Sequence, residues 1–333
     1  MVRNVEVLVT GCAGYIGSIL TPMLLERGYR VRCIDRLLYG DQGIRDILDD
    51  PRFRLVKKDV RGATLEDFRN ADAVIDMAAI AQPDPKGLIP EEYYEEINYK
   101  AAVRTATLAK KAGTQRLVFF STCSVYGARD EPVDENTPPN PLEAYAKTKA
   151  RAEREILSMA GRNFTPVALR VATVYGYSPK MRFDLVVNAM TLSLWEKGVI
   201  YVGRPGTQVR PLVHVKDVAR AAILALEAEK EKVHGEVFNV GSNEQNYRMV
   251  DLAHEIGRAI GKPYRVELIG EPDTRNYIVR FDKIRRVLGF EPRYTVSDGA
   301  REVYKALEEG LVKPTPETRV VEWIARLIRE GRL

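Results

Sequence analysis

Short apolar runs alternate with longer stretches of helical periodicity through the first half of the chain. The short runs are apolar at nearly every position, which is typical of parallel strands that are covered by helices on both faces. Six such strands are predicted, at Val5–Val9, Arg30–Ile34, Phe53–Lys57, Ala73–Met77, Arg116–Ser121 and Pro166–Arg170. The patterns between them predict helices at Ser18–Arg27, Glu91–Ala112 and Glu143–Ala160. The alternation predicts an α/β fold built on a doubly wound parallel sheet.

The regular alternation falters after Arg170. Prolines at 179, 205 and 211 and glycines at 198, 203 and 206 indicate a loop-rich insertion. The alternation returns over Leu212–Leu226 and in a strand-like run at Glu236–Val240, and the remaining residues are mixed. We therefore predict a large domain formed by residues 1–172 together with about 209–240, and a smaller, mixed domain formed by 173–208 and 241–333.

Three glycines stand between the first predicted strand and the first predicted helix, at Gly11, Gly14 and Gly17. Strand, glycine turn and helix in this order form the front of a dinucleotide-binding βαβ unit of the Rossmann type. A pyrophosphate must lie against backbone N–H groups at a helix N-terminus, and a Cβ atom there would block it. Because such spacing also arises by chance in loops, the prediction needs a second signal.

The second signal is Asp35, which ends the next apolar run 18 residues after Gly17. Its carboxylate can accept hydrogen bonds from the ribose of adenosine, and it would repel a 2′-phosphate. The two signals together predict bound NAD. The neighbouring Arg36 argues the other way, because an arginine at this position can receive the 2′-phosphate of NADP.

Tyr145 and Lys149 lie four positions apart in a predicted helix, so they share one of its faces. A tyrosine has a pKa of about 10, which is too high for a base at neutral pH. A cation about 4 Å away, at an effective dielectric constant of about 20, would stabilise the phenolate by about 4 kcal/mol and lower this pKa by about three. The pair therefore predicts a tyrosine that exchanges a proton with an alcohol or a carbonyl.

The fifth predicted strand runs into a turn that carries three hydroxyl groups, at Ser121, Thr122 and Ser124. Sheets of this kind bind ligands at the carboxyl ends of their strands. We predict that Thr122 hydrogen-bonds the reacting oxygen. Ser121 and Ser124 are alternatives, and all three could be ordinary turn hydroxyls.

Composition excludes several classes of function. The chain has 333 residues, of which 45% are hydrophobic, and a net charge of +5. Its 51 basic and 46 acidic residues are interspersed, without the basic run that nucleic-acid binding favours. Three scattered cysteines and three scattered histidines predict no metal site. The cysteines are few and no apolar run reaches 18 residues, so we predict a cytoplasmic protein without a membrane span or signal peptide.

Taken together, these motifs resemble the extended short-chain dehydrogenase/reductase family, in particular its NAD-dependent nucleotide-sugar epimerases and dehydratases such as the UDP-glucose 4-epimerases. The resemblance runs from about residue 5 to about 300. It rests on the glycine motif, Asp35, Asp59-Val60, Asp76-Met77-Ala78-Ala79, the segment STCSVYG and the pair Tyr145 and Lys149. It implies a Rossmann-type domain with Thr122, Tyr145 and Lys149 as catalytic residues.

The resemblance also implies binding residues and a homodimer. The implied cofactor residues are Gly11, Gly14, Tyr15, Ile16, Gly17, Asp35, Arg36, Asp59, Val60, Ala78, Ala79, Ala81, Tyr145 and Lys149. The implied substrate residues are Gln82, Ser124, Thr173, Asn188, Arg210 and Arg275. Of these, Asn188 would contact the nucleotide, and Arg210 and Arg275 would grip the diphosphate, for which a guanidinium is well suited.

The two residues after Thr122 depart from the pattern of the dehydratases. Family dehydratases carry an Asp-Glu pair there, whereas this chain has Cys123 and Ser124, which cannot act as that acid and base at neutral pH. We therefore expect an NAD-dependent epimerase of a nucleotide-diphosphate sugar, similar to a UDP-glucose/UDP-galactose 4-epimerase, that acts through a transient 4-keto sugar. The alternative is a one-way oxidoreductase, such as a reductase of a nucleotide-linked 4-keto sugar. A cofactor-binding sensor without activity is a third reading.

Overall fold

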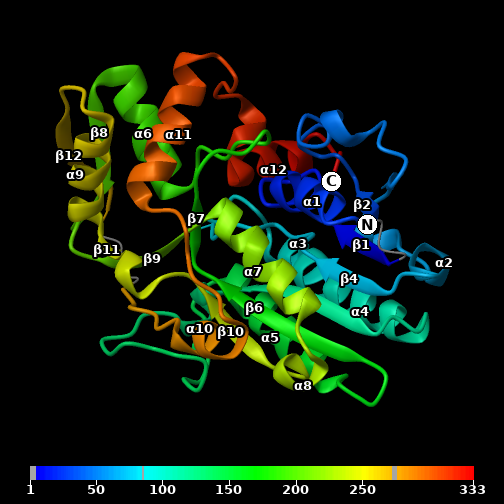
Figure 1. The fold of residues 1–333 in the computed structure, drawn as a ribbon. Coiled ribbons are helices and arrows are strands. Elements are labelled where there is room, and N and C mark those ends of the chain that lie inside the picture. The colour runs from blue at the N-terminus through cyan, green and yellow to red at the C-terminus, as the bar shows by residue number, and fades with distance from the viewer. Residues whose placement is uncertain (1–4, 85, 272–275) are drawn as a thin grey trace.

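The computed structural model describes residues 5–84, 86–271 and 276–333. Its largest feature is a seven-stranded sheet in the order β10-β6-β5-β4-β1-β2-β3, in which every neighbouring pair is parallel (Figure 1). The strands are β1 (Glu6–Thr10), β2 (Arg30–Asp35), β3 (Phe53–Lys57), β4 (Ala73–Asp76), β5 (Arg116–Thr122), β6 (Thr165–Val171) and β10 (Val237–Val240). The predicted doubly wound sheet is confirmed, and each predicted strand lies within one residue of its observed bounds.

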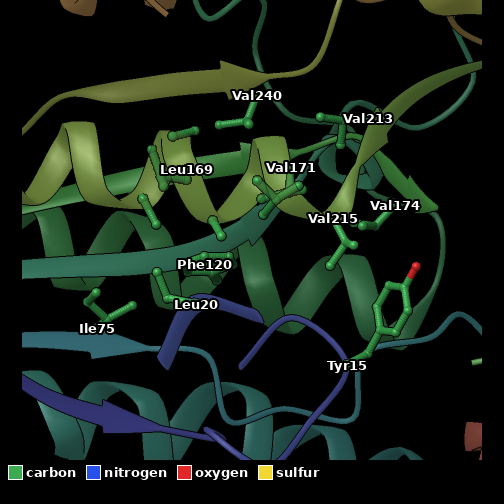
Figure 2. Packing of buried hydrophobic residues seen from close by; sticks show 14 of the residues in the cluster. Tyr15, Leu20, Ile75, Phe120, Leu169, Val171, Val174, Val213, Val215 and Val240 are labelled. Carbon is green, nitrogen blue, oxygen red and sulfur yellow. The ribbon is translucent and has the colours of Figure 1, made fainter. Parts of the chain in front are cut away.

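Helices bury both faces of this sheet. They are α1 (Gly17–Glu26) and α7 (Val215–Glu227) on one face, and α4 (Ala102–Lys111) and α5 (Ala144–Ser158) on the other. Phe120 of β5 belongs to the same buried cluster as Leu20 of α1, and Figure 2 shows both side chains there. The preceding Phe119 lies in the opposite cluster with Ala106 and Ile156. Because consecutive strand residues point to opposite faces, strands buried on both faces are apolar throughout.

The rest of the chain builds a smaller unit around two short sheets, in the orders β11-β9-β7 and β12-β8. Its strands are β7 (Thr173–Tyr175), β8 (Val199–Gly203), β9 (Val209–His214), β11 (Asn246–Arg248) and β12 (Arg265–Ile269). Its helices are α6 (Val186–Lys197), α9 (Met249–Ile260) and α11 (Val296–Glu308), which share one buried cluster. Figure 1 shows these elements to one side of the parallel sheet.

The segment 209–240, which we predicted to join the large domain, contributes to both parts. Strand β9 pairs with β7 and β11, whereas α7 contacts α1 and β10 pairs with β6. The division of the chain into two domains stays a prediction.

The predicted helix Glu91–Ala112 consists of three pieces, namely α3 (Glu91–Tyr94), a π-helical segment Glu95–Ala101, and α4. Asn98 lies in the π-helical segment and is fully buried. Its side chain accepts a hydrogen bond from the N–H of Ile80 at 2.8 Å and donates one to the carbonyl of Ile80 at 3.0 Å. An inward-facing asparagine thus holds the loop after β4, and π-helical turns often occur beside functional sites.

The remaining described elements are short, apart from the last helix. They are α2 (Leu65–Phe68), α8 (Lys230–Val233), α10 (Asp282–Leu288), α12 (Val320–Arg329) and the 3₁₀ turns Arg45–Ile47, Val60–Gly62, Cys123–Tyr126, Asn243–Gln245 and Pro316–Thr318. None of the helices in the described ranges is long and apolar enough to cross a bilayer.

A disulfide joins Cys12 in the glycine turn to Cys33 in β2, and both residues are fully buried. It ties the turn to the strand that ends at Asp35. The third cysteine, Cys123, is a buried free thiol.

Candidate active site

A pocket of about 570 Å³ opens at the carboxyl ends of the central parallel strands. The predicted residues that line it are Gly11, Gly14, Tyr15, Ile16, Gly17, Asp35, Arg36, Asp59, Val60, Ala78, Ala79, Ala81, Gln82, Thr122, Ser124, Tyr145, Lys149, Thr173 and Arg210. The position at the sheet edge is the one expected for a doubly wound fold, where ligands bind beyond the strand ends. Arg275 lies outside the described residues.

The glycine turn is packed too tightly for side chains. Gly11 has a φ of +76°, a conformation that L side chains rarely adopt. A Cβ atom on Gly17 would lie 2.4 Å from the carbonyl oxygen of Gly11 and 2.6 Å from backbone atoms of Cys12. Gly17 therefore lets α1 begin directly against the turn, and the N-terminus of this helix faces the pocket.

Asp35 holds the turn in place from the end of β2. Its carboxylate accepts the N–H of Ala13 at 3.0 Å and the N–H of Leu37 at 2.7 Å. Burial raises the pKa of Asp35, and these two hydrogen bonds oppose the rise. The carboxylate that we predicted to contact a ribose thus also positions the glycine turn.

Asp59 pairs with two arginines, Arg36 at 3.0 Å and Arg61 at 2.7 Å. Burial alone would raise the pKa of Asp59, but hydrogen bonds from Arg61 and the charge of Arg36 bring it below its ordinary value. Asp59 is therefore ionised at neutral pH at the edge of the pocket beyond β2.

Tyr145, near the start of α5, lies 91% buried beside the end of β5. Burial raises the pKa of its phenol above the ordinary value of 10, while a hydrogen bond with Thr122 and the charge of Arg182 lower it. Thr122 also accepts the N–H of Ser124 at 3.2 Å. The structure therefore brings together the predicted hydroxyl and the predicted phenol.

Lys149 lies in α5 as predicted, but the groups around its ammonium differ from those that we predicted. Its ammonium lies 4.5 Å from the ring centroid of Phe119, and the charges that act on it are those of Asp76 and Glu153. Burial lowers the pKa of Lys149 to about 8. Burial thus raises the pKa of Tyr145, opposite to the fall that we predicted from Lys149, and the catalytic role of Lys149 stays a prediction.

The alternatives to Thr122 are separated by their hydrogen bonds. Ser121 donates to the carboxylate of Glu153 at 2.6 Å, and Glu153 forms a buried ion pair with Arg170 at 2.6 Å. Ser121 lines the pocket too, but its hydroxyl is bound to this buried ion pair. Ser124 lines the pocket as Thr122 does. Thr122 and Ser124 therefore remain the candidates for the hydroxyl that acts with Tyr145.

Two cationic side chains that line the pocket, Arg182 and Lys180, were not predicted from the sequence. Arg182 is 8% exposed, and it donates to the carbonyl of Ala81 at 2.9 Å and to the side chain of Gln82 at 2.8 Å. It also forms an ion pair with Asp184 at 3.0 Å. Lys180 donates to the carbonyl of Glu317 at 3.0 Å, and burial lowers its pKa to about 8. The signal was present in the segment KMRFD, where charges interrupt an apolar stretch.

Asn188 is not among the residues that line the pocket, and its role as a substrate residue stays a prediction. It is fully buried, and its side-chain oxygen accepts the N–H of Gly176 at 3.0 Å. Its side-chain N–H groups donate to the hydroxyl of Tyr15 at 3.1 Å and to the carbonyl of Arg182 at 3.0 Å. All of its donors are used within the protein, where they position Tyr15 and Arg182.

The other predicted substrate residues lie where the smaller unit meets the pocket. Thr173 begins β7, and Arg210 lies in β9 with its guanidinium 5.6 Å from the ring centroid of Tyr277. Arg210 also donates to the carbonyl of Val209 at 2.8 Å. The ranges that the structure describes contain no cluster of three histidine, cysteine or acidic residues suited to a metal ion.

Asp76 makes the stability of the protein depend on pH. One carboxylate oxygen accepts the hydroxyl of Thr10 at 2.5 Å, and burial raises the pKa to about 6 from an ordinary value of 3.8. Since the folded pKa is raised, the stabilising contribution is complete below about pH 4 and is lost as the pH rises through 6. Ionisation of Asp76 should lower the free energy of unfolding by up to about 3 kcal/mol. Asp76→Asn should abolish this pH dependence and raise the melting temperature at pH 7.5.

Melting curves between pH 4 and 8 test this expectation. The exposed Asp49, changed to asparagine, is the matched control and should follow the unaltered protein at every pH. Parallel curves for Asp76→Asn and the unaltered protein would show that Asp76 does not titrate in this range.

Comparisons with known proteins agree with this geometry. A profile of the NAD dependent epimerase/dehydratase family matches residues 7–241. UDP-arabinose 4-epimerase 1 of Arabidopsis thaliana is 32% identical over 322 residues, which cover 87% of this chain and 76% of the relative. UDP-glucose 4-epimerase of Corynebacterium glutamicum is 30% identical over 310 residues, which cover 87% and 92%. The solved structure of UDP-glucuronic acid 4-epimerase from Bacillus cereus, with UDP-glucuronic acid and NAD, has a TM-score of 0.81 at 26% identity and covers 91% of this chain and 99% of that one. The chain therefore belongs to the NAD-dependent epimerase/dehydratase family.

Proposed function

We propose that this protein is an NAD-dependent 4-epimerase of a UDP-linked sugar. The observation that carries the proposal is the buried pair of Tyr145 and Thr122, which lies in the pocket that begins at the glycine turn. A hydroxyl paired with a phenol suits proton exchange with a sugar alcohol. The relatives whose names describe 4-epimerases of UDP-sugars support this substrate class.

The residues present fit the cofactor. The turn has no room for Cβ atoms at Gly17, the N-terminus of α1 faces the pocket, and the carboxylate of Asp35 stands at the end of β2. These groups suit a pyrophosphate and an adenosine ribose. Bound NAD would accept a hydride from C4 of the sugar and return it to the opposite face. Lys149 would hold the nicotinamide ribose, and Asp59 and Val60 would lie at the adenine.

The proton steps belong to Tyr145. As phenolate it takes the proton of the C4 hydroxyl while the hydride leaves C4, which together give a 4-keto sugar, and it returns the proton when a hydride reduces the ketone again. Thr122 hydrogen-bonds the same oxygen and stabilises the charge on the phenol. Arg182, whose charge lowers the pKa of Tyr145, would also stabilise the phenolate.

The chain lacks the groups for dehydration. Cys123 is fully buried, and burial raises the pKa of its thiol, so it stays protonated and cannot act as a base. Ser124 has no acidic proton at neutral pH. Elimination of water from the sugar needs both an acid and a base at these positions.

Incubation with UDP-galactose in the absence of added cofactor tests the proposal. An epimerase reuses its bound cofactor in every cycle, so UDP-glucose should form without a lasting rise in NADH absorbance. UDP-arabinose and UDP-glucuronic acid belong in the same panel, because relatives carry those substrates in their names. If none of these sugars is interconverted and added NADH is consumed with a 4-keto sugar, the one-way reductase is the correct assignment.

Two further properties belong to this proposal. We infer that the protein acts in the cytoplasm and that it forms a homodimer through the helices within 91–112 and α5, as the family resemblance implies. Arg210, together with Arg275, would hold the diphosphate of the substrate. Light scattering after size-exclusion chromatography measures the oligomeric state directly.

A further inference from the structure

Arg36 lies at the adenosine end of the cofactor pocket, immediately after Asp35. The two residues have opposite implications for the cofactor. The carboxylate of Asp35 disfavours a 2′-phosphate, whereas a guanidinium at the next position can bind one. Which implication holds depends on where the N–H groups of Arg36 are directed.

The guanidinium of Arg36 donates to groups from two distant parts of the chain. One nitrogen donates to the carboxylate of Asp59 at 3.0 Å and to the carbonyl of Leu333 at 3.2 Å. The other donates to the carbonyl of Arg332. Arg61 makes a matching set, with Asp59 at 2.7 Å and the carbonyl of Leu333 at 2.9 Å. Asp59 and the carbonyl of Leu333 thus accept from both arginines, and the carbonyl of Arg332 accepts from Arg36.

Helix α12 holds these carbonyls in place. The indole N–H of Trp323 donates to the carbonyl of Leu38 at 2.8 Å, just beyond Arg36 in the chain. Trp323, Ile324 and Leu327 are buried in one apolar cluster with Tyr145. The C-terminus lies beside the end of β2, where Arg36 follows (Figure 1). The contacts of Arg36 with residues 332 and 333 therefore rest on an anchored helix.

The same segment forms part of the pocket wall. Glu317, Val320, Ile324 and Leu333 line the pocket, and the N–H of Val320 donates to Asp184 at 2.9 Å. The segment 317–333 thus extends from the ion pair of Arg182 and Asp184 to the pair of Arg36 and Asp59. It contacts both ends of the pocket.

We propose that the segment Glu330–Leu333 is a cofactor-specificity element. Its carbonyls accept two of the five N–H groups of Arg36 and Asp59 accepts a third, so fewer donors are left for a 2′-phosphate, and Asp35 selects NAD over NADP. Asp59 adds to the effect because it neutralises the charge of the same guanidinium. The inference concerns binding of the dinucleotide, so it holds for an epimerase and for a one-way oxidoreductase alike.

Removal of residues 330–333 tests the proposal, because it deletes both carbonyls and leaves α12 and the anchor of Trp323 in place. Dissociation constants for NAD⁺ and NADP⁺ are measured by calorimetric titration of the full chain and the shortened chain, and circular dichroism confirms folding. We expect NADP⁺ to bind at least tenfold more tightly to the shortened chain, and NAD⁺ affinity to change by less than about threefold. An unchanged affinity for NADP⁺ in a folded, shortened chain would overturn the proposal.

Arg36→Ala provides the second arm and does not depend on the truncation. In the full chain it should change the weak binding of NADP⁺ only slightly, since three of the five N–H groups of Arg36 are already used within the protein. In the shortened chain, Arg36→Ala should abolish the gain in NADP⁺ affinity. A tenfold loss of NADP⁺ affinity in the full-length variant, or a gain that persists in the shortened variant, would contradict the assignment. Because the readout is binding rather than turnover, a failed epimerase assay would not affect either result.

Discussion

Tyr145→Phe should lower turnover of the UDP-sugar by about 10²–10⁴-fold, the range typical for loss of an acid–base group. The substitution keeps the ring, which is buried against α12, and removes only the phenol oxygen. NAD should bind with unchanged affinity, because the glycine turn and Asp35 are untouched. Steady-state kinetics and a cofactor titration measure the two effects separately.

Two companion variants sharpen this prediction. Thr122→Val keeps the shape of the side chain but removes the hydrogen bond that lowers the pKa of Tyr145. Since the phenolate is the active form, the rise of the rate with pH should move to higher pH. Tyr304→Phe, in α11 away from the pocket, is the matched control and should have normal turnover. Near-normal turnover of Tyr145→Phe would show that another group carries the proton.

Gly17→Ala should weaken NAD binding at least tenfold and destabilise the protein. The added Cβ would lie 2.4 Å from the carbonyl oxygen of Gly11 and 2.6 Å from the backbone of Cys12, and no flexible side chain is available to move away. Overpacking of this kind costs about 1–3 kcal/mol. Because the displaced atoms form the pyrophosphate site, the loss should affect binding as well as folding. Calorimetric titration with NAD⁺ and thermal unfolding measure both.

Gly161→Ala is the matched control for this substitution. A Cβ atom added to Gly161 would have the carbonyl oxygen of Met159 as its nearest neighbour, at 3.9 Å, which is an ordinary contact. Gly161 does not line the pocket. The control should bind NAD⁺ and unfold like the unaltered protein. Equal affinity and equal melting temperature for Gly17→Ala would mean that the turn is not held as tightly as the structure describes.

The parts of the site that sequence analysis located depend on local patterns. The strand β2, the carboxylate of Asp35 at its end and the helical spacing of Tyr145 and Lys149 each follow from residues within one element. The edge of the sheet that they share then follows from the parallel order of the strands. For this reason Thr122 and Tyr145, which come from different elements, could be predicted to meet.

The surroundings of Lys149 and Asn188, which the sequence did not indicate, depend on contacts between distant residues. Lys149 has the predicted position in its helix, but the groups around it are Phe119, Asp76 and Glu153 rather than the phenol. The family resemblance implies that Asn188 contacts the nucleotide. Its side chain donates hydrogen bonds to Tyr15 and to the carbonyl of Arg182. Neither choice is visible in the spacing of residues along the chain.

The parallel sheet, the glycine turn and the meeting of Thr122 with Tyr145 could be predicted from the sequence, because repeating patterns and short motifs specify local conformation. The pairing of the charges around the pocket could not, because it depends on residues that are far apart in the chain. Arg182 bonds the loop after β4 across 101 residues, and Arg36 bonds Leu333 across 297 residues. The energy of such contacts arises from burial and pairing in the folded chain, so the sequence of either partner alone does not indicate them.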